Sequence, residues 1–193
     1  MKRIRFILIA YFLMIPVIFI LPFYSLESYS ILNNTTSHLA AQNTPNSWIM
    51  NVVFCYLGVA TIIEGWEYLK NYWSQKIIIT VFGLTMIFTA VFQHAPIEPN
   101  IPFSVREDEL HSLFATLCGW SFVTFAVSSA YIEITKSHKV FAVAARVIAL
   151  LLSILMFSIT DLMGIWQRMI FMLSFAWLIY FFEGQRISAN EIS

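Results

Sequence analysis

Six long apolar runs, separated by short polar stretches, follow one another along this chain of 193 residues. A bilayer core of about 30 Å is crossed by about 20 apolar residues in a helix, and the runs have about this length. They lack the alternation of apolar and polar residues that is typical of β-barrel strands. We therefore predict an all-α bundle of six transmembrane helices, at residues 5–23, 48–69, 77–93, 110–132, 140–160 and 163–182.

The composition supports lipid as the main solvent of this bundle. Hydrophobic residues make up 59% of the chain and charged residues 11%, whereas soluble domains carry roughly 25% charged residues. The 11 basic and 11 acidic residues balance, which argues against a nucleic-acid partner. We expect one domain over residues 1–193, in the cell membrane, with membrane lipid as its main partner and a membrane protein as a further possible one.

The N-terminal run begins with basic residues, as a secretory signal does. Its apolar stretch extends to about Phe23, however, and no pair of small residues suited to cleavage follows it. We therefore expect this run to be retained as the first helix.

The basic residues also predict which side of the membrane each connection faces. Basic residues concentrate in cytoplasmic connections. If the N-terminus is cytoplasmic, eight basic residues lie on the cytoplasmic side and two, Arg106 and Arg168, lie towards the outer side. Both termini are then cytoplasmic, and two long segments, 24–47 and 94–109, face outward. The inside set is Lys2, Arg3, Arg5, Lys70, Lys76, Lys136, Lys139 and Arg186.

A series of short motifs carries a family resemblance. The motifs are YSILNNTTSHLAAQNTPNSWIMN before a helix with Gly58, VFQHAPIEPN at the end of the third run, LHSLFATLCGW in the fourth, and GIWQRM in the last. Their order resembles the membrane proteins grouped as domain of unknown function 998, over most of the chain. The chain departs from that pattern at 92–97, where an acid is expected and the first one is Glu98. The resemblance implies a small bundle of membrane helices and brings no activity with it.

Ionisable residues gather on the predicted outer side. His94, His111 and Asp108 lie close to the ends of the third and fourth runs, with His38 in the first outer segment and Asp161 before the last run. Imidazoles and carboxylates are ligands of zinc, and three ligands with one open position form a catalytic site. His94, His111 and Asp108 are therefore candidate ligands of a possible zinc ion. The alternative is that these residues are solvated loop side chains and helix caps, since no HExxH or HxxxH spacing is present.

Arg168 lies in the last predicted helix, about two turns beyond Asp161. A charged residue at this depth is costly unless it is paired or faces a wet cavity, so Arg168 is a candidate for binding a phosphate or carboxylate. The alternative is a structural ion pair with Asp161, seven residues earlier on the same face, or with an acid of the 94–109 segment.

On the inner side, Glu64 and Arg146 lie at matching depths in the second and fifth runs, and we expect them to form a structural ion pair. Glu64 and Glu67 could instead line a cavity that carries protons or ions. Four glycines, at 58, 83, 119 and 164, are expected to let helices approach closely. Cys55 and Cys118 are expected to be small core residues rather than a disulfide.

These patterns leave three classes of function open. The first is a protein that binds a lipid head group, a small anion or a partner in an outer pocket formed by Arg168, His94, His111, Asp161 and Asp108. The second is a metal-dependent hydrolase that cleaves a lipid or acyl bond at the same site. The third is a small transporter, which requires a polar path between Arg168 and Glu64. The sequence leaves open whether the protein is an enzyme.

Overall fold

The computed structural model describes residues 4–132 and 136–191, without the side chains at 136–138, 146 and 187–191. Within these residues every regular element is a helix, which confirms the all-α prediction. The elements are α1 (Phe6–Ile20), η1 (Leu21–Tyr24), α2 (Thr36–Leu39), α3 (Ser47–Tyr68), α4 (Trp73–Val91), α5 (Val105–Ser129), α6 (Lys136–Ser158), η2 (Thr160–Leu162) and α7 (Met163–Glu191).

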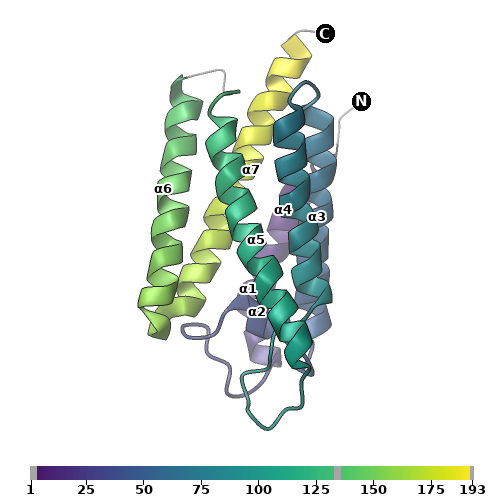
Figure 1. Cartoon of the computed structure of the whole chain (residues 1–193), viewed down its shortest axis with the longest axis vertical. Helices are drawn as coiled ribbons and strands as arrows, with labels where there is room; N and C mark the ends of the chain where they lie inside the picture. The colour runs from purple at the N-terminus through teal and green to yellow at the C-terminus, as the bar shows by residue number, and fades with distance from the viewer. Residues whose placement is uncertain (1–3, 133–135, 192–193) are drawn as a thin grey trace.

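Six helices of the described chain are long and apolar enough to cross a membrane. They are α1 with η1, and α3, α4, α5, α6 and α7. Figure 1 shows them as one elongated bundle, with both ends of the chain at the same end. The segments 25–46 and 92–104 lie at the opposite end, which we call the loop end. Which of the two ends faces the cytoplasm stays a prediction from the basic residues.

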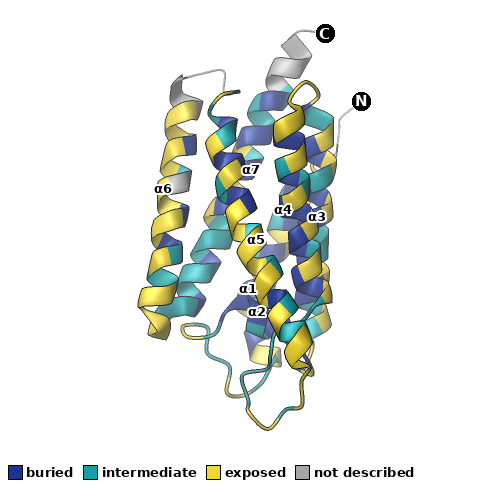
Figure 2. Cartoon of the chain, viewed as in Figure 1, coloured by how far each residue is buried: buried dark blue, intermediate teal, exposed yellow. Residues whose placement is uncertain are grey.

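Exposed residues run along the length of the bundle, most extensively on α6 (Figure 2), and many of them are large and apolar. Leu151 is 55% exposed and Ile154 is 60% exposed in the second half of this helix. Hydrocarbon is the solvent in which such a surface is stable, because lipid chains are as apolar as these side chains. The length, composition and exposed surface of the helices together indicate a multi-pass integral membrane protein.

Three helices begin earlier than the apolar runs indicate, and one of them, predicted at 140–160, is α6 and begins at Lys136. The third predicted helix, 77–93, is α4 and begins at Trp73, and the fourth, 110–132, is α5 and begins at Val105. The Ser104 side chain caps α5 by accepting a hydrogen bond from the Glu107 backbone N–H. Glu107 and Asp108 add negative charge to the first turn, where the helix dipole favours it. Hydropathy does not register these capping interactions. The polar first turn of α5 therefore resembles a loop, and the apolar run begins only at residue 110.

Glycines allow α3 and α4 to touch backbone to backbone. A Cβ atom on Gly58 would lie 2.5 Å from the carbonyl oxygen of Gly83, and one on Gly83 would lie 2.6 Å from that of Gly58. The expectation of close helix packing is confirmed for this pair. It is wrong for Gly119, whose added Cβ would meet no atom within 4 Å. Gly164 approaches the carbonyl oxygens of Ile31 and Asn34 in the 25–46 segment rather than a helix. Both cysteines are free thiols.

Candidate functional site

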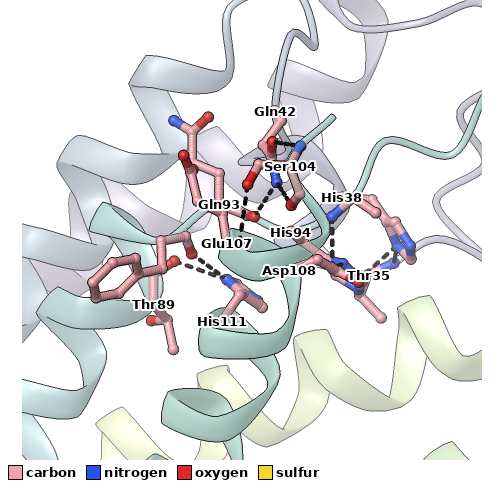
Figure 3. Close-up of polar contacts among 12 residues, drawn as sticks. Thr35, His38, Gln42, Thr89, Gln93, His94, Ser104, Glu107, Asp108 and His111 are labelled. Carbon is pink, nitrogen blue, oxygen red and sulfur yellow. Dashed lines mark hydrogen bonds and ion pairs between the residues drawn. The ribbon is translucent and has the colours of Figure 1, made fainter. Parts of the chain in front are cut away.

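Three imidazole rings stack on one another at the loop end of the bundle. His38 comes from α2, His94 from the segment that follows α4, and His111 from the second turn of α5. The ring centroids of His38 and His94 are 4.8 Å apart, and those of His94 and His111 are 5.0 Å apart. The planes of each pair lie within 22° of parallel. We call these three residues the histidine stack; Figure 3 shows them with their polar neighbours.

The two outer rings of the stack are anchored to helix ends through Nδ1. The Nδ1 atom of His38 accepts a hydrogen bond from the Thr35 backbone N–H at 3.1 Å, as part of the capping box of α2. The Nδ1 atom of His111 lies 2.9 Å from the carbonyl oxygens of Thr89 and of Phe92, at the end of α4. Carbonyl oxygens only accept, so His111 carries a proton on Nδ1, whereas neutral His38 carries its proton on Nε2.

The middle ring is held by a carboxylate. Nδ1 of His94 hydrogen-bonds to Oδ1 of Asp108, which also accepts the backbone N–H of Ala95 at 2.7 Å. Asp108 lies in the first turn of α5, so this contact joins the segment after α4 to the start of the next helix. A carboxylate partner selects the tautomer of His94 that carries its proton on Nδ1.

Burial controls the charge of His38. Loss of solvent is the largest cause that lowers the pKa of His38 from 6.5 to about 4; the neighbouring His94 and His111 contribute in the same direction, and Asp108 acts in the opposite direction. His38 is therefore a neutral ring near pH 7, which donates through Nε2.

Gln42 joins the two connecting segments that carry the stack. Its side-chain amide donates to the carbonyl oxygens of Gln93 and Ser104, at 2.8 and 3.0 Å, and accepts the backbone N–H of Ser104 at 2.7 Å. The Gln42 backbone N–H donates to the carbonyl oxygen of His94 at 2.9 Å. Sequence reasoning missed Gln42, because nothing in a polar loop distinguishes one glutamine whose partners lie more than 50 residues away in sequence.

Arg168 has a structural role in the described chain. Its side chain is 1% exposed, and its guanidinium donates to the carbonyl oxygens of Ile18, Ile31, Asn34 and Gly164 and to the hydroxyl of Tyr29. These five contacts are 2.7 to 3.1 Å long and all go to uncharged acceptors. Arg168 therefore fixes the 25–46 segment to α1 and α7. A buried arginine needs hydrogen-bond partners, but the sequence did not specify that these partners are backbone carbonyls.

The structure brings together only part of the outer site expected from the sequence. His94, His111 and Asp108 lie together, with His38 added to them. Asp161 is exposed in η2 and, within the described residues, has no hydrogen bond or ion pair with Arg168. Arg168 in turn contacts no histidine of the stack there.

The sequence that forms these elements matches the model of a known family. A family model described as "Protein of unknown function (DUF998)" matches residues 8–182 of this sequence. The chain belongs to the DUF998 family. This confirms the resemblance inferred from the motifs, and the match extends from α1 into α7 of the DUF998 protein. No curated protein and no solved structure matches the chain.

The proposed zinc ligands do not converge in this DUF998 protein. Among the described residues, no group of three His, Cys, Asp or Glu side chains is placed to hold a metal ion. His94 and His111 face each other as stacked rings, and the Nδ1 atom of each is already hydrogen-bonded. The geometry therefore gives the zinc hypothesis no support, and a metal site here stays a prediction from residue types alone.

The structure does not describe the side chain of Arg146, so the expected Glu64–Arg146 ion pair lies partly outside the described residues. The carboxylate of Glu64 accepts the backbone N–H of Ile7 at 2.8 Å, at the start of α1. Glu64 thus satisfies a free N–H in the first turn of that helix. The ion pair with Arg146 stays a prediction.

Proposed function

We propose that this DUF998 protein binds the polar head group of a membrane lipid at the histidine stack. The observation that carries the proposal is the use of the ring nitrogens. All three Nδ1 atoms are hydrogen-bonded within the protein, whereas no Nε2 atom of the three has a hydrogen-bond partner among the described residues. The rings are thus fixed in position with one edge of each left for a ligand, which is the arrangement that preorganised binding sites use.

The tautomers favour a ligand that donates hydrogen bonds. His94 and His111, protonated on Nδ1, present lone pairs on Nε2, while neutral His38 presents one N–H. The carboxylate of Asp108 beside His94 adds negative charge. A head group with hydroxyl or ammonium donors fits this set better than the small anion that the sequence also allowed.

The other two functions have less support. A metal-dependent hydrolase acting on a lipid or acyl bond needs three ligands that meet at one point. A small transporter needs a polar path through the bundle, and buried aromatic side chains, among them Phe82, Phe122 and Phe175, occupy its middle. No contact in the described chain favours a membrane-protein partner over lipid.

Native mass spectrometry of the purified protein tests the proposal. The probes are phosphatidylethanolamine, phosphatidylcholine and phosphatidic acid with the same two acyl chains. The first has ammonium N–H donors, the second has none and the third is an anion. The variants are His94→Phe and His111→Phe, which keep a stacking ring but remove its nitrogens. His138→Ala, which changes the one histidine outside the stack, is the matched control.

We expect the wild-type protein to retain phosphatidylethanolamine about tenfold more than phosphatidylcholine, the equivalent of about 1.4 kcal/mol. Both phenylalanine variants should lose this preference, and His138→Ala should keep it. Equal retention of the three lipids by the wild-type protein, or an unchanged preference in both phenylalanine variants, would overturn the proposal.

A further inference from the structure

A cavity of about 340 Å³ lies inside the bundle, between α3, α4, α5, α6 and α7. Its volume falls within the range of roughly 300–1,000 Å³ found for small-molecule sites. Six phenylalanines line it: the exposed Phe157, and five in the interior of the bundle that form its floor, Phe54, Phe82, Phe122, Phe171 and Phe175. The cavity is therefore apolar where it lies deepest in the bundle.

The other end of the cavity is lined by residues that neighbour or contact the histidine stack. Ser37, Thr89 and Gln167 line it there. Ser37 precedes His38 in α2, and the Thr89 carbonyl oxygen is a hydrogen-bond acceptor of His111. From Gln167 to Phe175 the α7 helix rises roughly 12 Å, a little under half of a hydrocarbon core of about 30 Å. The cavity thus has a polar end at the loop end of the bundle and an apolar end near mid-membrane.

The cavity is open towards the side of the bundle. Ala115, Thr116 and Gly119 of α5 line it and are exposed, and Gly119 has free space where a side chain would lie. Figure 1 shows α5 and α6 diverging towards the loop end, with α7 behind them. Hydrocarbon chains surround this part of a membrane protein, so they are the molecules that reach the opening.

Water is a poor occupant of this cavity. The hydroxyls of Thr89, Thr116 and Ser153 already donate to carbonyl oxygens of their own helices, at 2.7 to 2.8 Å. A buried water needs two to four polar partners, and the phenylalanine floor offers none. The Ser174 hydroxyl, 7% exposed, also lines the cavity and has no hydrogen-bond partner among the described residues. The protein leaves this space and this donor unused.

We infer that the cavity binds one hydrocarbon chain of a membrane lipid, which enters from the bilayer between α5 and α6. The position of the head group at the histidine stack rests on the proposed function; binding of the chain does not. A chain that fills the cavity gains the dispersion contacts that an empty apolar space forfeits. The length of the cavity suits the part of a chain that spans a single leaflet.

Two space-filling variants test this inference. Gly119→Leu places a side chain where the structure has free space and removes a glycine from a helix interior. Ser174→Leu fills the cavity from the opposite wall and removes the unpaired hydroxyl. Both are expected to fold, because neither deletes a packed group or a hydrogen bond. Ala144→Leu, on the exposed surface of α6, adds a similar volume outside the cavity and is the matched control.

The measurement uses phosphatidylethanolamine with a photoreactive diazirine in one acyl chain. We expect cross-links of the wild-type protein in residues 115–123 of α5 and 167–175 of α7. Both leucine variants should reduce these cross-links, and the lipid retained in native mass spectra, at least fivefold, while Ala144→Leu leaves both unchanged. Cross-links confined to the exposed face of α6, or normal retention in both leucine variants, would overturn the inference.

The same variants separate this inference from the proposed function. A leucine at 119 or 174 should reduce binding of lipids with every head group, because it excludes the chain. His94→Phe and His111→Phe should alter only the preference among head groups. Chain-dependent cross-linking without a head-group preference would therefore contradict the head-group proposal and leave the chain site standing.

Discussion

The guanidinium of Arg168 donates a hydrogen bond of 2.7 Å to the hydroxyl of Tyr29, 139 residues away in sequence. The same hydroxyl lies 2.8 Å from the carbonyl oxygen of Thr35, the residue that caps α2. Burial raises the pKa of Tyr29, an effect that Arg168 opposes. A neutral Tyr29 accepts from Arg168 and donates to Thr35, so it connects the buried arginine to the helix that carries His38.

Replacement of Arg168 by methionine should destabilise the fold. The variant leaves the carbonyl oxygens of Ile18, Ile31 and Asn34 without the donor they have now, and we expect a loss of about 3 kcal/mol. Thermal unfolding in detergent measures it. Arg106→Met, at an exposed position in α5, is the control and should unfold as the wild type does. Equal melting temperatures for the two variants would contradict the structural role of Arg168.

Protonation of His38 should make stability depend on pH. The pKa of His38 is lowered to about 4, chiefly by burial, so between pH 6.5 and 4 the unfolded chain binds a proton that the folded chain does not. Stability should therefore be complete above pH 6.5 and decrease as the pH falls to about 4, by roughly 3 kcal/mol from this group.

The free energy of unfolding, followed against pH for the wild type and His38→Gln, isolates this effect from that of other titrating groups. The glutamine variant should take up about one proton fewer on unfolding near pH 5. An identical pH dependence in the two proteins would show that His38 is not a buried neutral ring.

A methyl group at Gly58 should separate α3 from α4. The added Cβ would lie 2.5 Å from a backbone oxygen, which no side-chain rotation relieves. We expect Gly58→Ala to cost about 2 kcal/mol, measured by thermal unfolding. Gly119→Ala places the same methyl in open space and should be neutral or slightly stabilising. The prediction fails if the two alanine variants have the same stability.

Sidedness is testable with reporter fusions. The distribution of basic residues predicts cytoplasmic termini, so a fluorescent protein that matures only in the cytoplasm should fluoresce when fused after Ser193. A single cysteine introduced at Asn100, an exposed residue in the 92–104 segment, should react with a membrane-impermeant maleimide added to intact cells. Labelling at 100 only after the cells are opened would reverse the predicted orientation.

Hydropathy was sufficient to predict the number and order of the membrane helices, because the length of an apolar run measures directly whether a helix crosses the bilayer. It failed at the starts of α4, α5 and α6. The Ser104 cap and the acidic first turn of α5 stabilise helix by hydrogen bonds and charge, so their polar residues resemble a loop.

The candidate site was predictable in part. The pattern predicted that His94, His111 and Asp108 lie on one side of the membrane, because each is near a helix end. It did not predict the stacking of the rings, because the segments that carry them are joined by long-range contacts such as those of Gln42. For Arg168, its depth in the last helix indicated a need for partners, but backbone carbonyls have no sequence signature, so acids such as Asp161 were the expected partners.

The cavity opens to the side, between α5 and α6, and this opening determines in which units its affinity for a lipid chain should be expressed. A chain that arrives through the bilayer is presented at its mole fraction among the lipids, not at its concentration in water. A water-soluble analogue of the head group alone should therefore compete weakly, however well it matches the histidines. Minor changes in membrane composition would alter the occupancy of this DUF998 protein directly, without any change in the aqueous phase.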